Sequence, residues 1–384
     1  MPEISQYLSS VAGSATAQIF SAAKKLEAQG RDVIHFEIGQ PDFFPIDKIL
    51  DATAKFVKEG KVQYTVSKGI PEFRAAISSY YNKYSSSDPE CEVTVTAGGK
   101  LAIYASVWSV VNPGDNVIIL NPSWVSYGDI VLSLGAEPRY IATDFFFNFD
   151  EDALRRQIDS HTKAIILNSP CNPTGAIMGR KSIQLLFDIA SEHDLLLISD
   201  EMYNEYIYGD NEFSSLASIN GWKENGVVIN GMSKTFSMTG YRLGYAITNE
   251  SISKEINKVM QLTASCAPNF AQYAGVVAFQ NIDEMRLRIK KLMQPRRELV
   301  VKQLNELPNI EFSEPQGAMY AWFKVQELQD SIKWGSDLLQ ETGVAITPGR
   351  AFGPAGEGYA RISFATSKEH LVEGFSRINT FLST

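Results

Sequence analysis

The chain has 384 residues, of which 44% are hydrophobic and 21% are charged, as is ordinary for a globular protein. This length can bury a substantial core and allows one large domain beside a smaller one. The net charge of -9 and the lack of any Lys/Arg-rich run argue against a nucleic-acid partner, but they do not exclude an anionic substrate.

Cysteines, histidines and apolar stretches exclude further classes of protein. Cys91, Cys171 and Cys266 lie far apart in the sequence without a CxxC pair, so neither disulfides nor a zinc site are expected and a cytoplasmic location fits best. Cys171 is interpreted as a buried structural thiol. The four histidines lack ligand-type spacing, and we predict no metal. The sequence shows neither a secretory signal nor an apolar stretch near the roughly 20 residues of a membrane helix.

The middle of the chain alternates short apolar runs with longer amphipathic stretches, which predicts an α/β fold with a mostly parallel sheet flanked by helices. Helices are expected over 101–110 and 181–192, and a turn is expected at 112–115, where the sequence is Asn-Pro-Gly-Asp. The expected buried strands are 93–96, 117–120, 164–167, 195–199, 227–230 and 245–248.

Toward the C-terminus the pattern changes, and 282–305 predicts a long charged helix. We interpret this part as a second, smaller α+β domain onto which the N-terminal stretch packs. The predicted division gives 41–284 to the large domain and gives 1–40 with 285–384 to a discontinuous small domain. The short strand-like pieces of the small domain are 318–324, 344–347 and 359–364.

The run 231–244, Gly-Met-Ser-Lys-Thr-Phe-Ser-Met-Thr-Gly-Tyr-Arg-Leu-Gly, carries the clearest chemistry. Lys234 stands among small residues that leave room for a flat ring, and its amine can form an imine with an aldehyde cofactor. Arg242 can hold the phosphate of such a cofactor. The attack requires a neutral amine, so burial or nearby cations must lower the pKa of Lys234. The alternative is an ordinary surface lysine in a Ser/Thr-rich loop.

This run resembles the pyridoxal-phosphate lysine signature of class I aminotransferases and matches it at every position. The resemblance extends over 14–361. It implies a homodimeric transferase of fold type I with a seven-stranded sheet in the large domain. The other matching runs are Gly39-Gln40-Pro41-Asp42, Ala97-Gly98-Gly99-Lys100, Asn121-Pro122-Ser123-Trp124, Asn168-Ser169-Pro170-Cys171-Asn172-Pro173-Thr174-Gly175 and Ser199-Asp200-Glu201-Met202-Tyr203.

Three of these residues are expected to face the ring of pyridoxal 5'-phosphate. Asp200 directly follows an apolar run, and ligands gather at the carboxyl ends of parallel strands. Its carboxylate would keep the pyridine nitrogen protonated, whereas the alternative role is to cap a following helix. Tyr203 and Asn172 can hydrogen-bond the ring oxygen, and Asn172 can also donate to a substrate carboxylate or simply form the turn of its Asn-Pro-Thr-Gly loop.

The cofactor phosphate is expected at the start of a helix. Gly99 and Lys100 follow a strand, and the backbone N–H groups of a helix start bind phosphate. The spacing matches neither a P-loop nor a dinucleotide fingerprint. The resemblance adds Ser233, and Tyr64 from a second subunit, to this site. Many family members have a serine where Gly231 stands, so one phosphate hydroxyl is missing here.

The substrate is expected to lie between the cofactor and the small domain. By resemblance, Trp124 would stack on the cofactor ring, although a core position is the alternative. Arg361 suits a bidentate clamp on the substrate α-carboxylate, and Gly39 would approach the same group through its backbone. The residues that match an acidic side-chain pocket in prokaryotic aspartate aminotransferases are Ser14, Thr16 and Lys100.

The sequence thus predicts an aminotransferase that moves an amino group between an L-amino acid, aspartate or glutamate, and a 2-oxo acid such as 2-oxoglutarate. Lys234 would shuttle the proton as general base and acid. A β-lyase, an aromatic or prephenate-type aminotransferase and a non-catalytic cofactor-binding domain are the alternatives. For Lys100, the alternative is a solvated position on the first turn of a helix.

Overall fold

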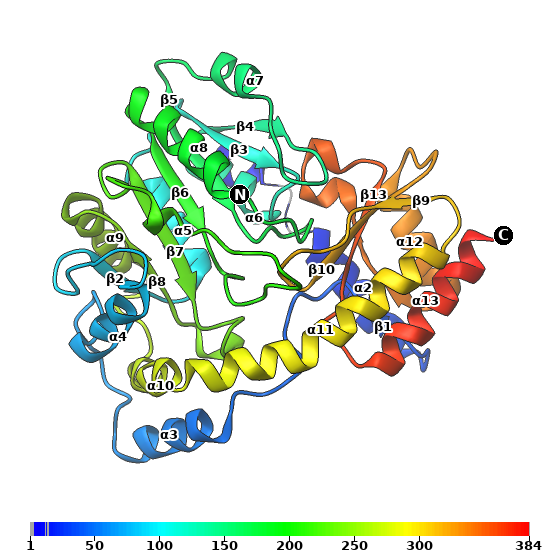
Figure 1. Cartoon of the computed structure of the whole chain (residues 1–384), viewed down its shortest axis with the longest axis horizontal. Helices are drawn as coiled ribbons and strands as arrows, with labels where there is room; N and C mark the ends of the chain where they lie inside the picture. Colours follow the sequence, from blue (N-terminus) through cyan, green and yellow to red (C-terminus); the bar gives the residue numbers. More distant parts are fainter. Residues whose placement is uncertain (1–3, 12, 14, 384) are drawn as a thin grey trace.

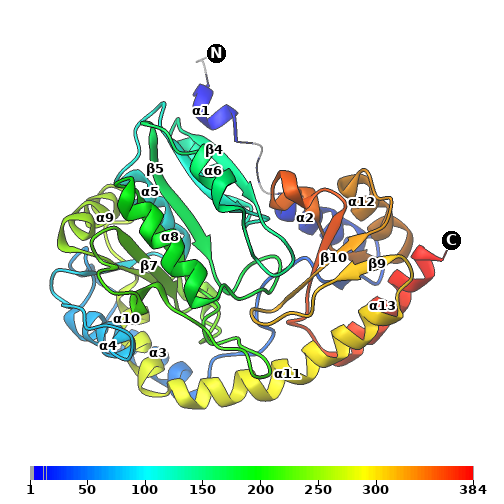
Figure 2. The same cartoon turned by 45° about the horizontal axis from the view of Figure 1, so that its top comes forward.

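The computed structural model describes residues 4–11, 13 and 15–383 and contains a large seven-stranded sheet beside a smaller four-stranded one (Figures 1 and 2). The large sheet has the order β2-β8-β7-β6-β5-β3-β4, in which only β8 runs antiparallel to its neighbours. The predicted mostly parallel α/β sheet is confirmed. Its strands are β2 (Val93–Thr96), β3 (Asn116–Asn121), β4 (Glu137–Ala142), β5 (Thr162–Asn168), β6 (Leu196–Asp200), β7 (Gly226–Gly231) and β8 (Gly244–Ile247).

Helices cover both faces of this sheet, which is why inner strands such as β3 and β7 are buried along their whole length. In β3, Val117 and Ile119 belong to one core cluster, while Ile118 and Leu120 face the other. Helices α5 (Gly99–Trp108), α6 (Ser126–Ser133) and α9 (Glu250–Thr263) pack on the first face. The second face meets α3 (Asp47–Lys58), α4 (Pro71–Tyr81), α8 (Arg180–Glu192) and α10 (Asn269–Gln280).

Strand β4 was not predicted, because it lies at the sheet edge and is only partly buried. Its sequence, Glu-Pro-Arg-Tyr-Ile-Ala, contains no apolar run and buries mainly Ile141. The predicted piece 344–347 is also different in the structure. It divides into β11 (Val344–Ala345) and β12 (Thr347–Pro348), which pair with strands of two separate sheets. An apolar run in the sequence indicates that a strand is buried, but it does not indicate which strand will pair with it.

The smaller part combines the antiparallel sheet β12-β13-β10-β9 with a parallel pair of β1 and β11. Because β1 (Ile34–His35) belongs to the N-terminal stretch, that stretch packs on C-terminal elements. The other elements of this smaller part are α2 (Ala15–Ala28), β9 (Ile310–Phe312), β10 (Tyr320–Val325), β13 (Tyr359–Ser363), α12 (Ser331–Thr342) and α13 (Lys368–Leu382), with short 3-10 turns at Gly349–Phe352 and Pro354–Gly356. The large part also includes α7 (Glu151–Arg156), short 3-10 turns at Leu216–Ser218 and Thr239–Tyr241, and α1 (Gln6–Ser9), which contacts α6.

The long helix α11 (Ile282–Glu306) runs along both parts of the molecule (Figure 2). Its first turns carry Met285 into the core of the large sheet, whereas Met293 and Val300 enter the core of the small one. The predicted long charged helix is therefore present. The domain boundaries near residues 40 and 284 stay a prediction, because this helix joins the two cores without a break.

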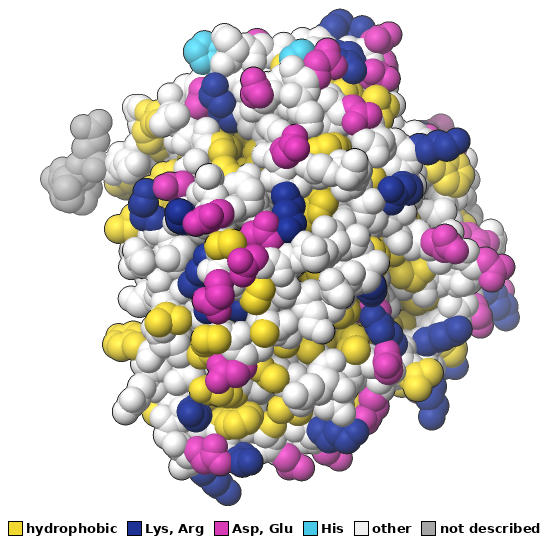
Figure 3. Space-filling view, turned by 60° about the vertical axis from the view of Figure 1, so that its left-hand side comes forward, with side chains coloured by type: hydrophobic (Ala, Val, Ile, Leu, Met, Phe, Trp, Pro, Cys, Tyr) yellow, Lys and Arg dark blue, Asp and Glu magenta, His cyan; other side chains and the backbone are white. Residues whose placement is uncertain are grey.

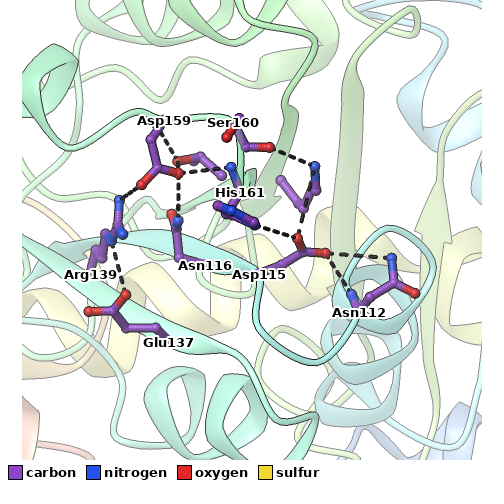
Figure 4. A network of polar contacts seen from close by, with 10 residues as sticks. Asn112, Asp115, Asn116, Glu137, Arg139, Asp159, Ser160 and His161 are labelled. Carbon is purple, nitrogen blue, oxygen red and sulfur yellow. Dashed lines mark hydrogen bonds and ion pairs between the residues drawn. The ribbon is translucent and has the colours of Figure 1, made fainter.

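A network of polar side chains fixes the amino ends of β3, β4 and β5 (Figure 4). Asp200 lies at the opposite, carboxyl ends of the strands. Asp159 accepts hydrogen bonds from Arg139 Nη1 at 2.7 Å, Asn116 Nδ2 at 3.0 Å and the His161 backbone N–H at 2.8 Å. The Arg139 guanidinium, followed by the His161 N–H, holds the pKa of Asp159 well below its usual range. The network ties three loops together.

We expect Asp159→Ala to lower Tm by roughly 2–5 °C at pH 7 and to leave kcat unchanged, since the network lies far from the cleft. A carboxyl whose folded pKa is lowered stabilises the fold above its unfolded pKa, and this stabilisation is lost as the pH falls through the folded pKa. The Tm difference should therefore shrink in acid. Thermal melts at pH 7 and pH 3 measure it, with the exposed Asp210→Ala as control; equal melting of both variants and the parent at pH 7 contradicts the role.

Candidate active site

A cleft of about 400 Å³ opens where the parallel strands end and the small sheet faces them. All predicted site residues line it except two. Tyr64 is 87% exposed and lies away from the cleft, and Ser14 falls outside the described residues. The predicted residues that the cleft brings together are Thr16, Gly39, Gly99, Lys100, Trp124, Asn172, Asp200, Tyr203, Ser233, Lys234, Arg242 and Arg361.

Lys234 lies in the loop after β7, with its amine inside the cleft. Its Nζ donates to the carbonyl oxygen of Gly39. Burial, followed by the positive charges of Arg361 and Arg242, lowers the pKa of Lys234 to about 8. Gly39 has no room for a side chain, because a Cβ there would collide with the hydroxyl of Tyr320. The pKa of about 8 gives this partly buried amine a far larger neutral fraction near physiological pH than an ordinary lysine has, and the neutral form is the one that nucleophilic attack requires.

Asp200 is the last residue of β6 and is fully buried. It accepts hydrogen bonds from Tyr127 Oη at 2.7 Å and from the Met202 N–H at 3.1 Å. Burial raises its pKa to about 6, against the opposing effect of these donors. The alternative of a helix cap is wrong, because a turn follows Asp200 instead of a helix. The carboxylate is held rigidly at the strand end, as expected for a ligand site.

The start of α5 and Arg242 form a site suited to an anion. Gly98 precedes the helix with φ of 91°, and a Cβ there would meet the Arg242 guanidinium. The first N–H groups of a helix have no intrahelical partner, and they favour negative charge. Gly231, where the family often has serine, is crowded by backbone, since a Cβ would lie 2.9 Å from the Leu243 carbonyl oxygen. In this chain a serine at position 231 would therefore require β7 and β8 to shift apart locally.

Arg361 is a fully buried cation on β13 without a carboxylate partner within 4.0 Å in the described part of the chain. Its Nη1 donates to Asn172 Oδ1 at 3.2 Å and its Nη2 donates to Thr347 Oγ1 at 3.0 Å, while Nε has no partner there. The guanidinium lies over the Tyr320 ring, 4.5 Å from its centre. A buried charge left unpaired is costly, so this group is suited to binding an anion from solution.

The remaining predicted side chains lie between these groups. Tyr203 Oη is 2.8 Å from Tyr320 Oη, and the two rings meet edge to face. Trp124 is half-buried: it lines the cleft and also packs on the core beneath it, which agrees with both of its proposed roles. The Nζ of Lys100 lies 4.9 Å from the Trp124 ring centre, so this lysine faces the cleft although it starts a helix.

Several residues of the cleft were missed by sequence reasoning. Asn168 ends β5 and donates to the Asp200 backbone oxygen at 2.9 Å. The rule that selected Asp200, a polar residue ending a buried strand, would also have found Asn168. Tyr127 stands one turn after Trp124 on a helix that was not predicted. Tyr320 comes from β10, and no local pattern connects it to Tyr203.

Cys171 is not among the residues that line the cleft. Cys171 is buried, and burial raises the pKa of its thiol to about 11, which confirms the predicted structural thiol. Within the described ranges, no group of three or more His, Cys, Asp or Glu residues could hold a metal ion. Over the same residues, no helix is long and apolar enough to cross a membrane.

Comparison of the whole chain with known proteins identifies its family. Residues 31–378 match the family model described as aminotransferase class I and II. An aspartate aminotransferase of Pyrococcus abyssi is 38% identical, with 92% of each chain covered. A (5-formylfuran-3-yl)methyl phosphate transaminase of Methanocaldococcus jannaschii is 37% identical, with 95% of each covered. The solved structure of Thermus thermophilus aspartate aminotransferase with maleate superimposes with a TM-score of 0.93 at 32% identity and full coverage of both chains. The chain therefore belongs to the class I and II aminotransferases, a family of pyridoxal-phosphate-dependent transferases.

Proposed function

We propose that this aminotransferase binds pyridoxal 5'-phosphate through Lys234 and exchanges amino groups between aspartate or glutamate and 2-oxo acids such as 2-oxoglutarate. The observation that carries the proposal is the convergence of three groups on one cleft. These are the amine of Lys234 with its lowered pKa, the buried carboxylate of Asp200 and the unpaired cation of Arg361. Each matches a different part of a cofactor–amino acid pair.

The residues present fit the cofactor. The anion site formed by Gly99, Ser233 and Arg242 would hold its phosphate, and Asp200 would pair with its ring nitrogen. The further residues that would contact the ring or its oxygen are Tyr203, Asn172 and Trp124. When bound, the cofactor supplies an electron sink for the bond broken at Cα of the substrate.

The chain's own residues would bind, orient and move protons. Arg361 is positioned to grip the α-carboxylate together with the amide of Asn172, which fixes the orientation of the bonds at Cα. Lys234 would take and return the Cα proton as general base and acid. Its pKa of about 8 suits both directions of transfer near neutral pH.

The lowered pKa of Lys234 gives a testable pH dependence for cofactor capture by the apoprotein. Only the neutral amine attacks, so the second-order rate should rise about tenfold per pH unit up to about pH 8 and then level off. The absorbance change on adding pyridoxal phosphate measures this rate. An ordinary lysine, with a pKa of about 10.4, would give a rate that still climbs between pH 9 and 10.

The preference for an acidic side chain rests on Lys100 and Thr16, which both line the cleft, with the Nζ of Lys100 over the Trp124 ring. A lysine in this position offers a point charge for a second carboxylate. Relatives named aspartate aminotransferases support the proposal, while the furan phosphate transaminase shows that similar chains act on other substrates. The solved structure of an aromatic aminotransferase from Pyrococcus horikoshii is 35% identical and keeps that alternative open.

A panel of amino acids assayed with 2-oxoglutarate tests the substrate class. Aspartate should be the best donor, and Lys100→Ala should raise its KM about tenfold or more while changing that of a neutral donor little. An aromatic or neutral amino acid as the best donor contradicts the acidic preference without affecting the aminotransferase assignment. Release of pyruvate and ammonia without an acceptor would indicate a β-lyase instead.

We also propose a homodimer in which Tyr64 reaches the phosphate site of the partner. Tyr64 lies among exposed apolar side chains, and Figure 3 shows hydrophobic side chains gathered toward the end of the molecule that holds α3 and α10. Mixing Lys234→Ala with Tyr64→Phe chains tests it, because a hybrid dimer contains one intact site if Tyr64 acts across the interface. Activity of the mixture no higher than that of Tyr64→Phe alone contradicts the arrangement.

A cytoplasmic location stays a prediction.

A further inference from the structure

His35 connects two carboxylates, one on the surface helix α2 and one buried beside the cleft. Its Nδ1 lies 2.7 Å from Glu37 Oε1, and its Nε2 lies 3.1 Å from Glu27 Oε1. A neutral imidazole has one N–H and donates to one of them, whereas the imidazolium donates to both. The two contacts therefore fit protonated His35. The hydrogen bond to Glu37, above the opposing effect of burial, raises the pKa of His35.

Glu37 is fully buried, and its second oxygen, Oε2, has no hydrogen-bond partner among the described residues. The residue lines the cleft, and its backbone carbonyl accepts a hydrogen bond from Arg361 Nη2. Burial lowers the pKa of the Arg361 guanidinium, and Tyr320, Tyr203 and, as the smallest of the three influences, the carboxylate of Glu37 act in the opposite direction. The negative charge of Glu37 therefore lies close enough to influence what Arg361 binds.

Few other charged side chains lie near the pair of His35 and Glu37 in the described structure. From α2 come Glu27 and Lys24, which form an ion pair of 2.7 Å, and from β13 comes Arg361. Lys24 also lies over the ring of Phe20, which in turn packs against His35. The charge of protonated His35 thus compensates that of Glu37 through a direct contact of 2.7 Å.

We propose that His35 and Glu37 are positioning residues that set the affinity of Arg361 for carboxylate substrates. Protonated His35 neutralises Glu37 and leaves the field of Arg361 available to the substrate. Loss of the His35 proton leaves an uncompensated carboxylate beside Arg361, which repels an incoming α-carboxylate. By linkage, a bound carboxylate must raise the pKa of His35 by the same coupling free energy. The inference rests on the proposed carboxylate-binding role of Arg361.

Binding of two inert carboxylates to the holoenzyme, maleate and 3-phenylpropionate, tests the proposal by calorimetry from pH 6 to pH 9. Maleate carries a second carboxylate and 3-phenylpropionate carries a phenyl ring, so at least one probe should bind whichever side chain the enzyme prefers. His35→Gln should bind the better probe about fivefold more weakly than the parent at pH 6 and equally at pH 9. Glu37→Gln should bind about fivefold more tightly than the parent at pH 9, and the double variant should behave like Glu37→Gln.

At each pH, the affinity of a variant is compared with that of the parent as a ratio. Groups that titrate in every variant, including the cofactor-bearing lysine, affect both affinities equally and cancel in this ratio. His193→Gln, which removes a histidine on α8's C-terminal side, should follow the parent throughout. If His35→Gln binds like the parent at every pH, the proposal is wrong while the role of Arg361 stands. If neither probe binds the parent, the proposed role of Arg361 fails and takes this inference with it.

The histidine rings give a direct second readout. The chain contains four histidines, so the NMR signal lost in His35→Gln identifies that ring. Saturating the parent with whichever probe binds should shift the titration midpoint of this signal upward. The midpoints of His161, His193 and His370 should stay fixed. If His35 had a merely structural role, the titration midpoints of all four histidines would stay unchanged when the probe binds. An unchanged midpoint for His35 would therefore overturn the coupling.

Discussion

Replacing Lys234 by alanine is expected to lower kcat by at least about 10⁴-fold, the largest effect of any single substitution in this protein. The change removes the nucleophile that would hold the cofactor and also the base that would move the Cα proton. The fold should survive, because the side chain's hydrogen bond is a single contact with the Gly39 carbonyl. Single-turnover kinetics with a saturating amino acid, followed by the cofactor absorbance, measures the loss.

Lys234→Arg is the matched control, since it keeps a cation in the cleft. A guanidinium does not lose its proton at accessible pH and therefore supplies neither nucleophile nor base. Both variants should be inactive to a similar degree. If Lys234→Arg retained a tenth or more of the parent turnover, the positive charge alone would explain the role of Lys234, and its proposed chemistry would be wrong.

Asp200→Ala is expected to lower kcat by two or more orders of magnitude. Removing one partner of a buried charge pair costs about 3–5 kcal/mol, which corresponds to roughly 10²–10⁴ in rate when the pair is needed in the transition state. The carboxylate is buried at the end of β6 and is held in place by hydrogen bonds from Tyr127 and the Met202 N–H. Steady-state kinetics with saturating cofactor measures the effect.

Asp200→Asn separates charge from shape, because the amide fills the same space without the charge. It should lose nearly as much activity as Asp200→Ala. Tyr127→Phe keeps the carboxylate and removes one donor to it, so it should lose much less. Near-normal turnover of Asp200→Asn would show that the negative charge is not required and would remove the proposed partner of the ring nitrogen.

Local patterns predicted those parts of the fold that are buried on both sides. The apolar runs at β3, β5 and β7 are strands, because the inner strands of a sheet covered on both faces favour apolar residues through their middle. The edge strand β4 lacks this constraint and escaped notice. The piece 344–347 was predicted as one strand, since nothing in its sequence reports that β11 and β12 enter different sheets.

The candidate site divides in the same way. Asp200 was found because strand ends in parallel sheets converge, and Lys234 was found because its run matches a known signature. Contacts across the chain were out of reach. Arg361 donates to a carbonyl 324 positions earlier, and Tyr320 of the small sheet meets Tyr203 in the turn after β6. Such pairs are set by how the two sheets face each other, which no local sequence pattern encodes.

The covalent role of Lys234 can be measured directly. Reduction of the cofactor-loaded protein with borohydride, followed by proteolysis and mass spectrometry, locates the lysine that carries the pyridoxyl group. We predict a single modified peptide with the label on Lys234, and none after reduction of Lys234→Ala. A label on Lys100 or another lysine, or a parent protein that remains unlabelled, would contradict the assignment of this cleft as the catalytic site.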